Sequence, residues 1–534
     1  MFRPLLPALL LAACGPDPLA PTALYGGDDD APVHELLVLP NLDDDRGNDR
    51  PDWETPNANA EDDEVLGFSF RRRSLRGSLE LRLEGGPARV WARGEVVLRR
   101  SGDTFVIDAD WADEPLYVEV GAPGVDASLV LTQRNGRGNT RRELTVPVRG
   151  APLVLGHHLQ PAQELWVTEI PQFDPFWNNV SMVESYRAIF GDALTAIASQ
   201  DVGFDPWVQD EIEVGTFQIP GQDRTVFLDS VRDGGLDTFA KSRLDADVAI
   251  VRWGDPDFAS TFDSFGNLEA SPPVEVDGVS YPLGRIYLGD DGTFGPVPAL
   301  VDGLDAQRVQ APIHLDSAWL CVAHVDEFVS FVPDASSPKG FRVVWADPML
   351  AFDILDELPP GTALPRYAPV SFERGHGRRD VGSIAGDAAL RAYNEDLVAD
   401  HLEPQWRTLV AELGLTESDR ISVPMIYQPL DYCEGAAGSL TPGLVNLVML
   451  DVGAGPKVVM PDPYIRPDPD DPTDDPFIDY VRASFPPELD VHFVDNWYVY
   501  HLGGGEVHCG TNERRVQDVP WWEDAAHLLP EGPE

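Results

Sequence analysis

Apolar and polar residues alternate in short runs through residues 33–150. The runs are SLELRLE, ARVWARGEVVLRR, TFVIDADW, LYVEVG, ASLVLTQ and ELTVPVR, and the turn signals GG, SGD, APG and RNGRGN separate them. A period of two places one set of side chains on each face of a strand, and the turns favour antiparallel hairpins. We therefore predict that residues 33–150 form a β-sandwich of immunoglobulin type.

The pattern changes after residue 150, where helical and strand-like segments alternate. SMVESYRAIFGDALTAIAS (181–199) and NEDLVADHLEPQWRTLVAELGL (394–415) carry apolar residues at helical spacing. TVFLDS, ADVAIVRW, FVSFVP and LVNLVMLDV are strand-like. A chain of 534 residues is long enough for two cores. We predict an α/β domain over residues 151–534.

The first residues, MFRPLLPALLLAACGPD, combine one arginine, a short apolar run and small residues before Cys14. The run is too short to span a bilayer, and the small residues are typical of a cleavage site. The pattern resembles a bacterial lipoprotein signal, which implies removal of residues 1–13 and lipidation of Cys14. Residues 14–32 are then a flexible tether, and the protein is anchored in the cell envelope, periplasmic or at the surface. An ordinary secretory signal is the alternative.

Charge narrows the range of partners. The chain has 39 Lys+Arg against 90 Asp+Glu, which gives a net charge of −51. Such a surface repels nucleic acid and attracts cations or basic polypeptides. Four cysteines, at positions 14, 321, 433 and 509, are too few for a disulfide scaffold.

The segment DPWVQDEIEVG (205–215) concentrates oxygen-bearing side chains. If it is a strand, Gln209, Glu211 and Glu213 face one side and Asp210 faces the other. Three such side chains on one edge suit a hard cation such as calcium, which leaves Asp210 for another role. A solvated acidic edge is the alternative.

Two further segments carry nucleophilic or acid–base groups. In VAHVDEF (322–328), His324 and Asp326 are two residues apart and would share a strand face. In GEVHCGTNERR (505–515), Cys509 lies in a glycine-led loop after a histidine. Taken singly, a satisfied polar pair and a small buried cysteine would explain both segments.

In this order, the segments resemble the catalytic domain of the peptidylarginine deiminases over roughly residues 155–534. The matching motifs are Trp-x-Gln-Asp-Glu-x-Glu, VFLDS-x-RDG, DSFGNLE, ASPPV, YPLGRI, RVQAP, HVDEF, ELGLTESD, GEVHCGTN-x-RR and the pair Trp521-Trp522. A looser likeness joins PNLDDDRGNDRPDW and AEDDEV to the calcium-binding middle domain of that family.

The resemblance implies a five-bladed α/β propeller, the pentein or guanidino-group-modifying fold, with the active site in its central tunnel. The β-sandwich precedes it, so the fold class is α/β plus β. The implied activity is calcium-dependent hydrolysis of protein-bound arginine to citrulline and ammonia through a covalent cysteine adduct. Arginine-containing proteins or peptides are the implied substrates.

The resemblance also assigns roles to individual residues. Asp210 and Asp326 would bind the guanidinium, His324 would be the general acid/base, and Cys509 would be the nucleophile. Trp207 would pack on the methylene stem of the substrate, and Arg232 would bind the substrate as well. Deimination needs these groups, because the guanidinium is a permanent cation and its carbon must be attacked while ammonia leaves.

Several calcium ions are implied by the same resemblance, since all the matching ligands are hard oxygen donors. The ligands implied in the catalytic domain are Gln209, Glu213, Glu269 and the backbone oxygens of Phe265 and Leu268 for one site, and Glu211, Asp229, Ser230 and Asp233 for a second. The ligands implied in the middle-domain sites are Asn41, Asp43, Asp45, Asp62, Glu64 and Asp247, where a solvated acidic loop is the alternative.

Two departures from the family pattern remove basic and bulky side chains from the pocket rim, and the residues implied to be catalytic are unchanged. Gly234 replaces a second basic residue, and Gly503–Gly505 lacks the basic and bulky residues often found before the cysteine. The chain also has no room for a first β domain, which contributes to dimerisation in relatives, so a monomer is expected. A deiminase of free arginine or another small guanidino compound stays open. A catalytically inert calcium-binding surface lipoprotein is disfavoured, because it would not need all four site residues.

Overall fold

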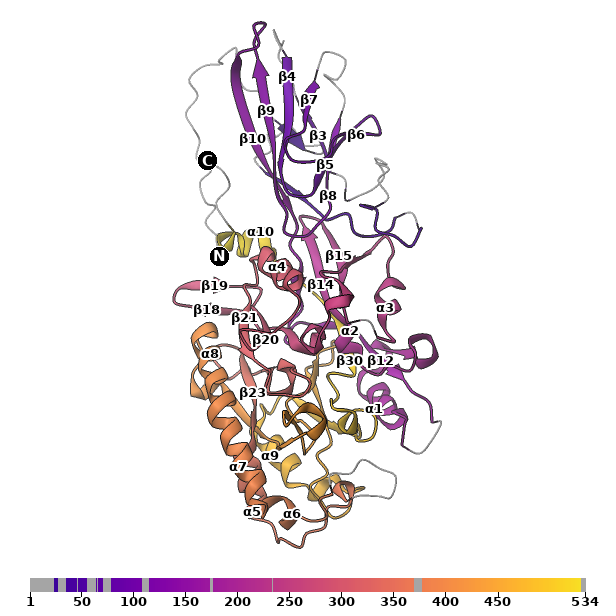
Figure 1. Cartoon of the computed structure of the whole chain (residues 1–534), viewed down its shortest axis with the longest axis vertical. Helices are drawn as coiled ribbons and strands as arrows, with labels where there is room; N and C mark the ends of the chain where they lie inside the picture. The colour runs from indigo at the N-terminus through magenta and orange to yellow at the C-terminus, as the bar shows by residue number, and fades with distance from the viewer. Residues whose placement is uncertain are drawn as a thin grey trace. The chain divides into compact units, whose positions relative to one another are not determined.

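The computed structural model describes residues 24–26, 35–45, 47–54, 64, 66–70, 78–107, 115–172, 176–232, 234–368 and 377–529. The predicted signal peptide (1–13), Cys14, Asp62 and Asp233 lie outside these residues. The chain divides into two compact units (Figure 1). Unit 1 contains the described residues up to 40 and between 56 and 150, and unit 2 contains those of 41–55 and from 151 onward.

Unit 1 consists of two five-stranded sheets. In the first sheet the strand order is β1 (Leu24–Gly26), β3 (Leu66–Phe70), β8 (Leu116–Val120), β5 (Ala88–Ala92) and β6 (Glu95–Leu98). In the second it is β2 (Leu36–Val38), β10 (Thr140–Gly150), β9 (Asp126–Arg134), β4 (Ser78–Gly85) and β7 (Thr104–Ile107). One apolar core takes residues from both sheets, which makes the unit a β-sandwich.

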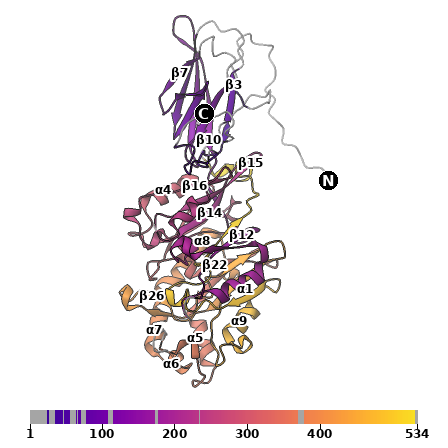
Figure 2. The same cartoon turned by 90° about the vertical axis from the view of Figure 1, so that its right-hand side faces the viewer.

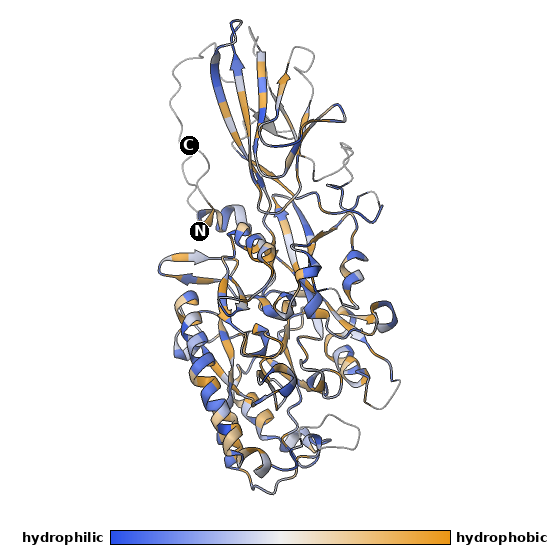
Figure 3. Cartoon of the chain, viewed as in Figure 1, coloured by the Kyte–Doolittle hydropathy of each residue, from blue (hydrophilic) through white to orange (hydrophobic). Residues whose placement is uncertain are grey.

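The alternation in the sequence explains how this sandwich is filled. Along β4, Leu79, Leu81 and Leu83 are buried in the core, and the intervening residues are more exposed. Figure 3 shows this alternation of hydrophobic and hydrophilic residues along β4. Two details differ from a purely antiparallel sandwich that begins after a tether. β2 pairs in parallel with β10, and β1, within the range predicted as a tether, pairs antiparallel with β3.

Unit 2 repeats one pairing pattern in five sheets of the described chain: a central strand with one antiparallel and one parallel neighbour. The sheets are β30 (Thr511–Arg515)–β12 (Ala162–Glu169)–β13 (Leu194–Ala198); β14 (Ile212–Ile219)–β15 (Gln222–Asp229)–β16 (Val248–Val251), with β11 (Val154–Leu155) beside β14; β17 (Leu268–Ala270)–β20 (Ile286–Asp290)–β21 (Ile313–Asp316); β22 (Val329–Pro333)–β23 (Phe341–Asp347)–β24 (Arg420–Pro424); and β27 (Val448–Leu450)–β28 (Lys457–Pro461)–β29 (Asp490–Val494).

The pairing of β30 with β12 joins the end of the unit to its beginning. It thereby brings residues from both ends of the unit close together. Two short hairpins accompany the five sheets: β18 (Val274–Val276) with β19 (Val279–Tyr281), and β25 (Tyr427–Pro429) with β26 (Ala437–Ser439). The α/β character predicted for residues 151–534 is therefore present as a set of small sheets.

Helices connect and cover these sheets. They are α1 (Val180–Phe190), α2 (Val208–Glu211), α3 (Asp237–Lys241), α4 (Pro298–Gln307), α5 (Pro348–Asp356), α6 (Gly382–Ala385), α7 (Ala388–Leu397), α8 (Glu403–Leu413), α9 (Pro476–Ser484) and α10 (Trp521–Asp524). A π-helical turn, Val398–Leu402, joins α7 to α8, which confirms the helix predicted over 394–415. Figure 2 shows α5, α6 and α7 gathered together. Among the described residues, none of these helices combines the length and the apolar character needed to cross a membrane.

The helix predicted over residues 181–199 is only half correct. α1 ends at Phe190, where Gly191 adopts a φ of 59° that continues no right-handed helix. Residues 194–198 form β13 instead, in parallel with β12. Pairing with β12 stabilises the strand, and the spacing of apolar residues along the chain does not predict such a pairing.

Candidate functional site

Cys509 lies two residues before the start of β30, and it is the free cysteine of the described residues. Its thiol is buried, with 3% of the residue exposed. The side-chain amide of Asn446 donates a hydrogen bond to Sγ at 3.1 Å, and Sγ lies 3.5 Å from Oδ2 of Asp326. Asn446 also accepts hydrogen bonds from the backbone N–H groups of His508 and Cys509. This single amide therefore fixes the loop and contacts the sulfur.

Trp207 covers the thiol from the side of the glycine-rich loop. A Cβ at Gly505 would stand 3.1 Å from Sγ of Cys509 and 2.6 Å from the Trp207 ring, so only glycine fits there. The ring packs edge to face on Tyr500, with 5.5 Å between centroids. The aromatic residue predicted to hold the methylene stem thus lies beside the predicted nucleophile.

His324 and Asp326 come together through a tight turn, so the prediction that they share a strand face is wrong. Val325–Glu327 is a single 3₁₀ turn, and His324 precedes it. Both side chains close on Gly266, where a Cβ would lie 2.7 Å from Nδ1 of His324 and 3.1 Å from Oδ2 of Asp326. A 3₁₀ turn is short enough to aim residues i and i+2 at one point when a glycine opposite leaves the space.

Asp210 lies on α2, so the strand considered for residues 205–215 is present only from Ile212, where β14 begins. Its Oδ1 is 3.7 Å from Nδ1 of His324, and its Oδ2 accepts a hydrogen bond from Nη1 of Arg232 at 2.6 Å. The four residues predicted to be catalytic, Asp210, His324, Asp326 and Cys509, are therefore gathered around one point. Asp210 already holds a guanidinium of the chain itself.

Burial raises the pKa values of the acidic groups in this cluster. Burial, together with the negative charges of Asp326, Glu327 and Asp210, raises the pKa of the Cys509 thiol well above its usual value. Burial also raises the pKa of Asp210, although His324 and Arg232 act in the opposite direction. In the same way, burial and Asp326 raise the pKa of Glu327 well above its usual range. A cation placed among these groups would lower the pKa of all three, because it favours their negatively charged forms.

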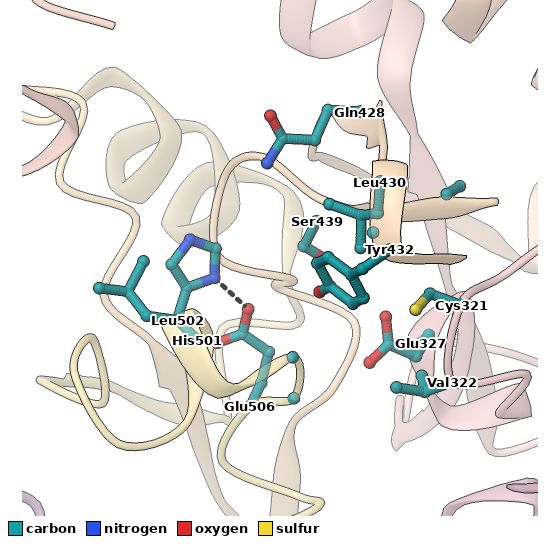
Figure 4. A pocket seen from close by; sticks show the side chains of 14 residues that line it. Cys321, Val322, Glu327, Gln428, Leu430, Tyr432, Ser439, His501, Leu502 and Glu506 are labelled. Atoms are coloured by element: carbon teal, nitrogen blue, oxygen red, sulfur yellow. Dashed lines mark hydrogen bonds and ion pairs between the residues drawn. The ribbon is translucent and has the colours of Figure 1, made fainter. Parts of the chain in front are cut away.

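A cavity of about 600 Å³ is lined by chain neighbours of the cluster, among them Gly505, whereas none of the four cluster residues lines it. Glu327, Tyr432 and Glu506 also line it. Glu506 is fixed by His501, whose Nδ1 lies 2.8 Å from its Oε1, as the dashed line in Figure 4 marks. A volume of this size is typical of small-ligand pockets, and Glu327 and Glu506 are the two carboxylates in a lining that is otherwise mostly apolar or neutral.

A disulfide joins Cys321, which lines this cavity, to Cys433, and the number and spacing of the cysteines do not predict it. The two residues are 112 positions apart, with 5.6 Å between their Cα atoms. Cys321 lies three residues before His324, so the bond ties the segment carrying that histidine to the β25–β26 hairpin. The residues linked are too distant in sequence for spacing to have indicated the pair.

The first predicted calcium set converges in part. Nε2 of Gln209 donates to Oε2 of Glu213 at 2.8 Å and to the backbone oxygen of Phe265 at 3.2 Å, so these groups surround one position. Burial and the charge of Glu269 raise the pKa of Glu213 well above its usual range. A buried group of oxygen atoms with surplus negative charge fits a calcium ion. Leu268 follows as the first residue of β17.

All residues of the second predicted calcium set except Asp233 lie within the described part of the chain. Glu211 is buried, and burial together with the charge of Asp229 raises its pKa to about 8. The backbone N–H of Ser230 donates to the backbone oxygen of Glu211 at 2.8 Å, which holds the two residues side by side. Asp229 forms an ion pair with Arg252 at 3.5 Å. Glu211, Asp229 and Ser230 therefore fit a cation, and the part of Asp233 stays a prediction.

The residues predicted for the middle-domain sites do not all fall in one unit. Asn41, Asp43 and Asp45 belong to unit 2, as does the exposed Asp247, whereas Glu64 belongs to unit 1. Asn41 and Asp43 are buried, and Oδ2 of Asp43 lies 3.5 Å from Arg224. Calcium binding by this group stays a prediction.

Asn446 is the functional candidate that sequence reasoning missed. It stands inside the apolar run Leu444–Leu450, and a buried amide in such a run is a signal that could have been used. The motif around Cys509 was local and could be read directly, whereas the amide arrives from 63 residues earlier in the chain.

A profile of the family described as protein-arginine deiminase (PAD) matches residues 142–523. The mouse protein-arginine deiminase type-4 is 32% identical over 416 residues, which cover 72% of this chain and 57% of the mouse protein. The human type-1 protein is 34% identical over 408 residues, which cover 71% and 56% respectively. The chain thus spans little more than half the length of these relatives.

Among solved structures, an agmatine deiminase from C. jejuni aligns with a TM-score of 0.35 and 11% identity, over 69% of this chain and 98% of that one. This likeness is too low to support an inference.

Proposed function

Because the chain belongs to the protein-arginine deiminase family, we propose that it is a calcium-dependent hydrolase that converts protein-bound arginine to citrulline and ammonia. The observation that carries the proposal is the convergence of a buried thiol, two carboxylates and a histidine, near a cavity lined by Glu327 and Glu506. We further propose that the five sheets of unit 2 are the blades of a pentein propeller around this site.

Asp210 and Asp326 hold the substrate guanidinium in this proposal. A carboxylate pair can accept several N–H groups of the planar fork and balances its permanent charge. Arg232 already makes such a contact with Asp210 at 2.6 Å, so the substrate must displace it or share the carboxylate. Arg232 is 40% exposed in its side chain and can turn outward at little cost.

Cys509 supplies the nucleophile. Its thiolate adds to the guanidinium carbon, and a C–N bond then breaks while His324 gives a proton to the departing nitrogen, which leaves as ammonia. Water next adds to the same carbon and passes a proton to His324. The C–S bond breaks, the remaining hydroxyl proton passes to the ammonia, and citrulline and the Cys509 thiolate are released. The sum is the arginine cation plus water giving citrulline plus ammonium.

The arriving substrate provides the charge that the thiolate needs. A unit positive charge about 4 Å from the sulfur is worth about 4 kcal/mol at an effective dielectric constant of about 20, which is about three pKa units. The same carboxylates that raise the thiol pKa are neutralised by the guanidinium that they bind. The site therefore becomes nucleophilic when it is filled with a cation.

Calcium is proposed to organise this site rather than to take part in bond making. Gln209, Glu213, Glu269 and the Phe265 backbone oxygen would hold one ion, and Glu211, Asp229 and Ser230 would help to hold another. Each set takes one residue from α2, the helix that carries Asp210. A bound ion would offset the repulsion among these carboxylates and fix the helix.

The lipid anchor at Cys14 and the location in the cell envelope remain proposals that rest on the N-terminal sequence. Mass spectrometry of the mature protein tests them. An acylated Cys14 as first residue is expected, and an intact Met1 would contradict the anchor.

The activity is tested by measuring citrulline formation on a blocked arginine peptide and on free arginine, each in calcium and in excess chelator. We expect turnover of the peptide in calcium only, and none in Cys509→Ala, which removes the attacking atom. Preference for free arginine would favour the small-molecule alternative suggested by the glycine-rich rim. Full activity in chelator would contradict the calcium dependence.

A further inference from the structure

Two histidines and one glutamate meet in unit 2 behind the nucleophile, outside the groups used in the proposed reaction. Nε2 of His158 lies 3.5 Å from Oε2 of Glu269, and Nε2 of His508 lies 3.5 Å from Oε1 of the same carboxylate. The three side chains come from the turn after β11, from β17 and from the loop before Cys509. All three are more than nine-tenths buried.

These separations suit a shared metal ion better than direct hydrogen bonds. Ligand atoms about 2.0–2.1 Å from a tetrahedral zinc ion lie about 3.3 Å from one another. Hydrogen bonds between such groups are normally about 2.7–2.9 Å long. Oε1 of Glu269 also has no hydrogen-bond partner, although it is buried. The carboxylate is thus aimed at the two imidazoles without bonding closely to either.

The second nitrogen of each imidazole is held in the manner of metal-binding histidines. Nδ1 of His508 lies 3.0 Å from Oδ2 of Asp326, and Nδ1 of His158 lies 3.1 Å from the hydroxyl of Ser330. Partners on the remote nitrogen fix the ring and turn the other nitrogen toward the ion. Both rings therefore present Nε2 to one position beside Glu269.

We propose that His158, Glu269 and His508 bind a divalent transition-metal ion of the zinc class. Two imidazole nitrogens and a carboxylate are a set that zinc accepts, here with Oε2 toward His158 and Oε1 toward His508, and a further position is left for water. Calcium takes oxygen ligands and has little affinity for imidazole, so this site would differ in kind from the calcium sites of the proposed function.

Cobalt and zinc titrations of the chelator-treated full chain test the site without any activity measurement. We expect one equivalent of Co²⁺ to give the visible absorption of a four- or five-coordinate ion, and one equivalent of Zn²⁺ to abolish it. His158→Ala should weaken binding by at least about 100-fold and Ser330→Ala by about 10–100-fold. His157→Ala is the matched control, because that neighbouring buried ring accepts a bond from the Leu159 N–H and should leave binding unchanged.

X-ray absorption at the zinc edge of the wild-type chain reads the donors directly, in case His158→Ala does not fold. Two imidazoles and oxygen are expected. An all-oxygen shell, no binding by the wild-type chain, or an unchanged cobalt spectrum in folded His158→Ala would overturn the proposal.

One consequence rests on the proposed function, because Glu269 belongs to both the zinc-class site and the first calcium set. Zinc should raise the calcium concentration needed for half-maximal activity in the wild-type chain and have no such effect in His158→Ala. The cobalt spectrum is independent of turnover, so failure of the deiminase proposal and failure of the metal site give different results.

Discussion

Asn446→Asp should suppress the reactivity of Cys509 while preserving the loop. The native amide makes hydrogen bonds through both of its polar atoms. Oδ1 accepts hydrogen bonds from the backbone N–H groups of His508 at 2.9 Å and of Cys509 at 3.3 Å, and Nδ2 donates a hydrogen bond to Sγ at 3.1 Å. Aspartate has the same shape and keeps the accepting oxygen. It replaces the donor that faces the sulfur and, at 3.5 Å, the backbone oxygen of Asp326, and the replacement is an anionic oxygen.

The size of the effect follows from these distances. Loss of a hydrogen bond to a charged sulfur costs the thiolate about 1.5–3 kcal/mol. A negative charge 3.1 Å from the sulfur adds about 5 kcal/mol of repulsion at an effective dielectric constant of about 20. With about 1.4 kcal/mol per pKa unit, the first contribution alone raises the thiol pKa by one to two units. We therefore expect alkylation at neutral pH to slow by at least about 10-fold.

The assay is the pH dependence of alkylation of Cys509 by iodoacetamide, followed by intact mass. Asn394→Asp is the matched control, because that buried amide bonds to the backbone of Leu390 and Tyr427, away from the thiol. A folded Asn446→Asp protein whose profile overlies that of the wild type would refute the idea that this amide supports the thiolate.

A cationic haloacetamidine should alkylate Cys509 and spare the two disulfide-bonded cysteines; a label found chiefly on either of those would contradict the assignment of the nucleophile. Glu213→Gln removes an anionic oxygen from the proposed calcium set, so half-saturating calcium should rise about 10-fold in an activity titration, and an unchanged midpoint would exclude Glu213 from the set. In chelator, the melting temperature should fall as the pH rises from about 6.5 to 8. Burial raises the pKa of Glu211 and of Glu269 from 4.5 to about 8, so the folded state binds these protons more tightly and each group loses about 1.4 kcal/mol of stability per pH unit in that interval. Calcium should flatten this dependence, and a melting temperature that rises over the interval in chelator would contradict it.

The local pattern of the sequence predicts the structure correctly wherever the contacts that determine it are close in sequence. The alternation in β4 predicts which leucines enter the sandwich core, because a strand has only two faces. The helical spacing of residues 394–415 likewise predicts the long helix of α7 and α8. Residue identities in the motifs around Asp210, His324, Asp326 and Cys509 were enough to name the candidate chemistry, because each motif is itself continuous.

Tertiary structure decided how those motifs become one site. Residues 208–211 form a helix and His324 precedes a 3₁₀ turn, although the spacing of side chains along the sequence is compatible with strands. Contacts with Gly266 and Cys509 outweigh the local pattern. Pairing of β30 with β12 brings a loop near residue 509 against segments near residue 210, some 300 positions away.

The contacts that no spacing in the sequence could indicate are those between groups on different sheets. The amide of Asn446 on Sγ of Cys509, the Cys321–Cys433 bond and the convergence of His158, Glu269 and His508 all join segments separated by 60 residues or more. The sequence by itself determined which reactive groups are available. Their distances, burial and pKa values depend on the packing of five small sheets, because side-chain periodicity carries information about a face of one element and none about what lies opposite it.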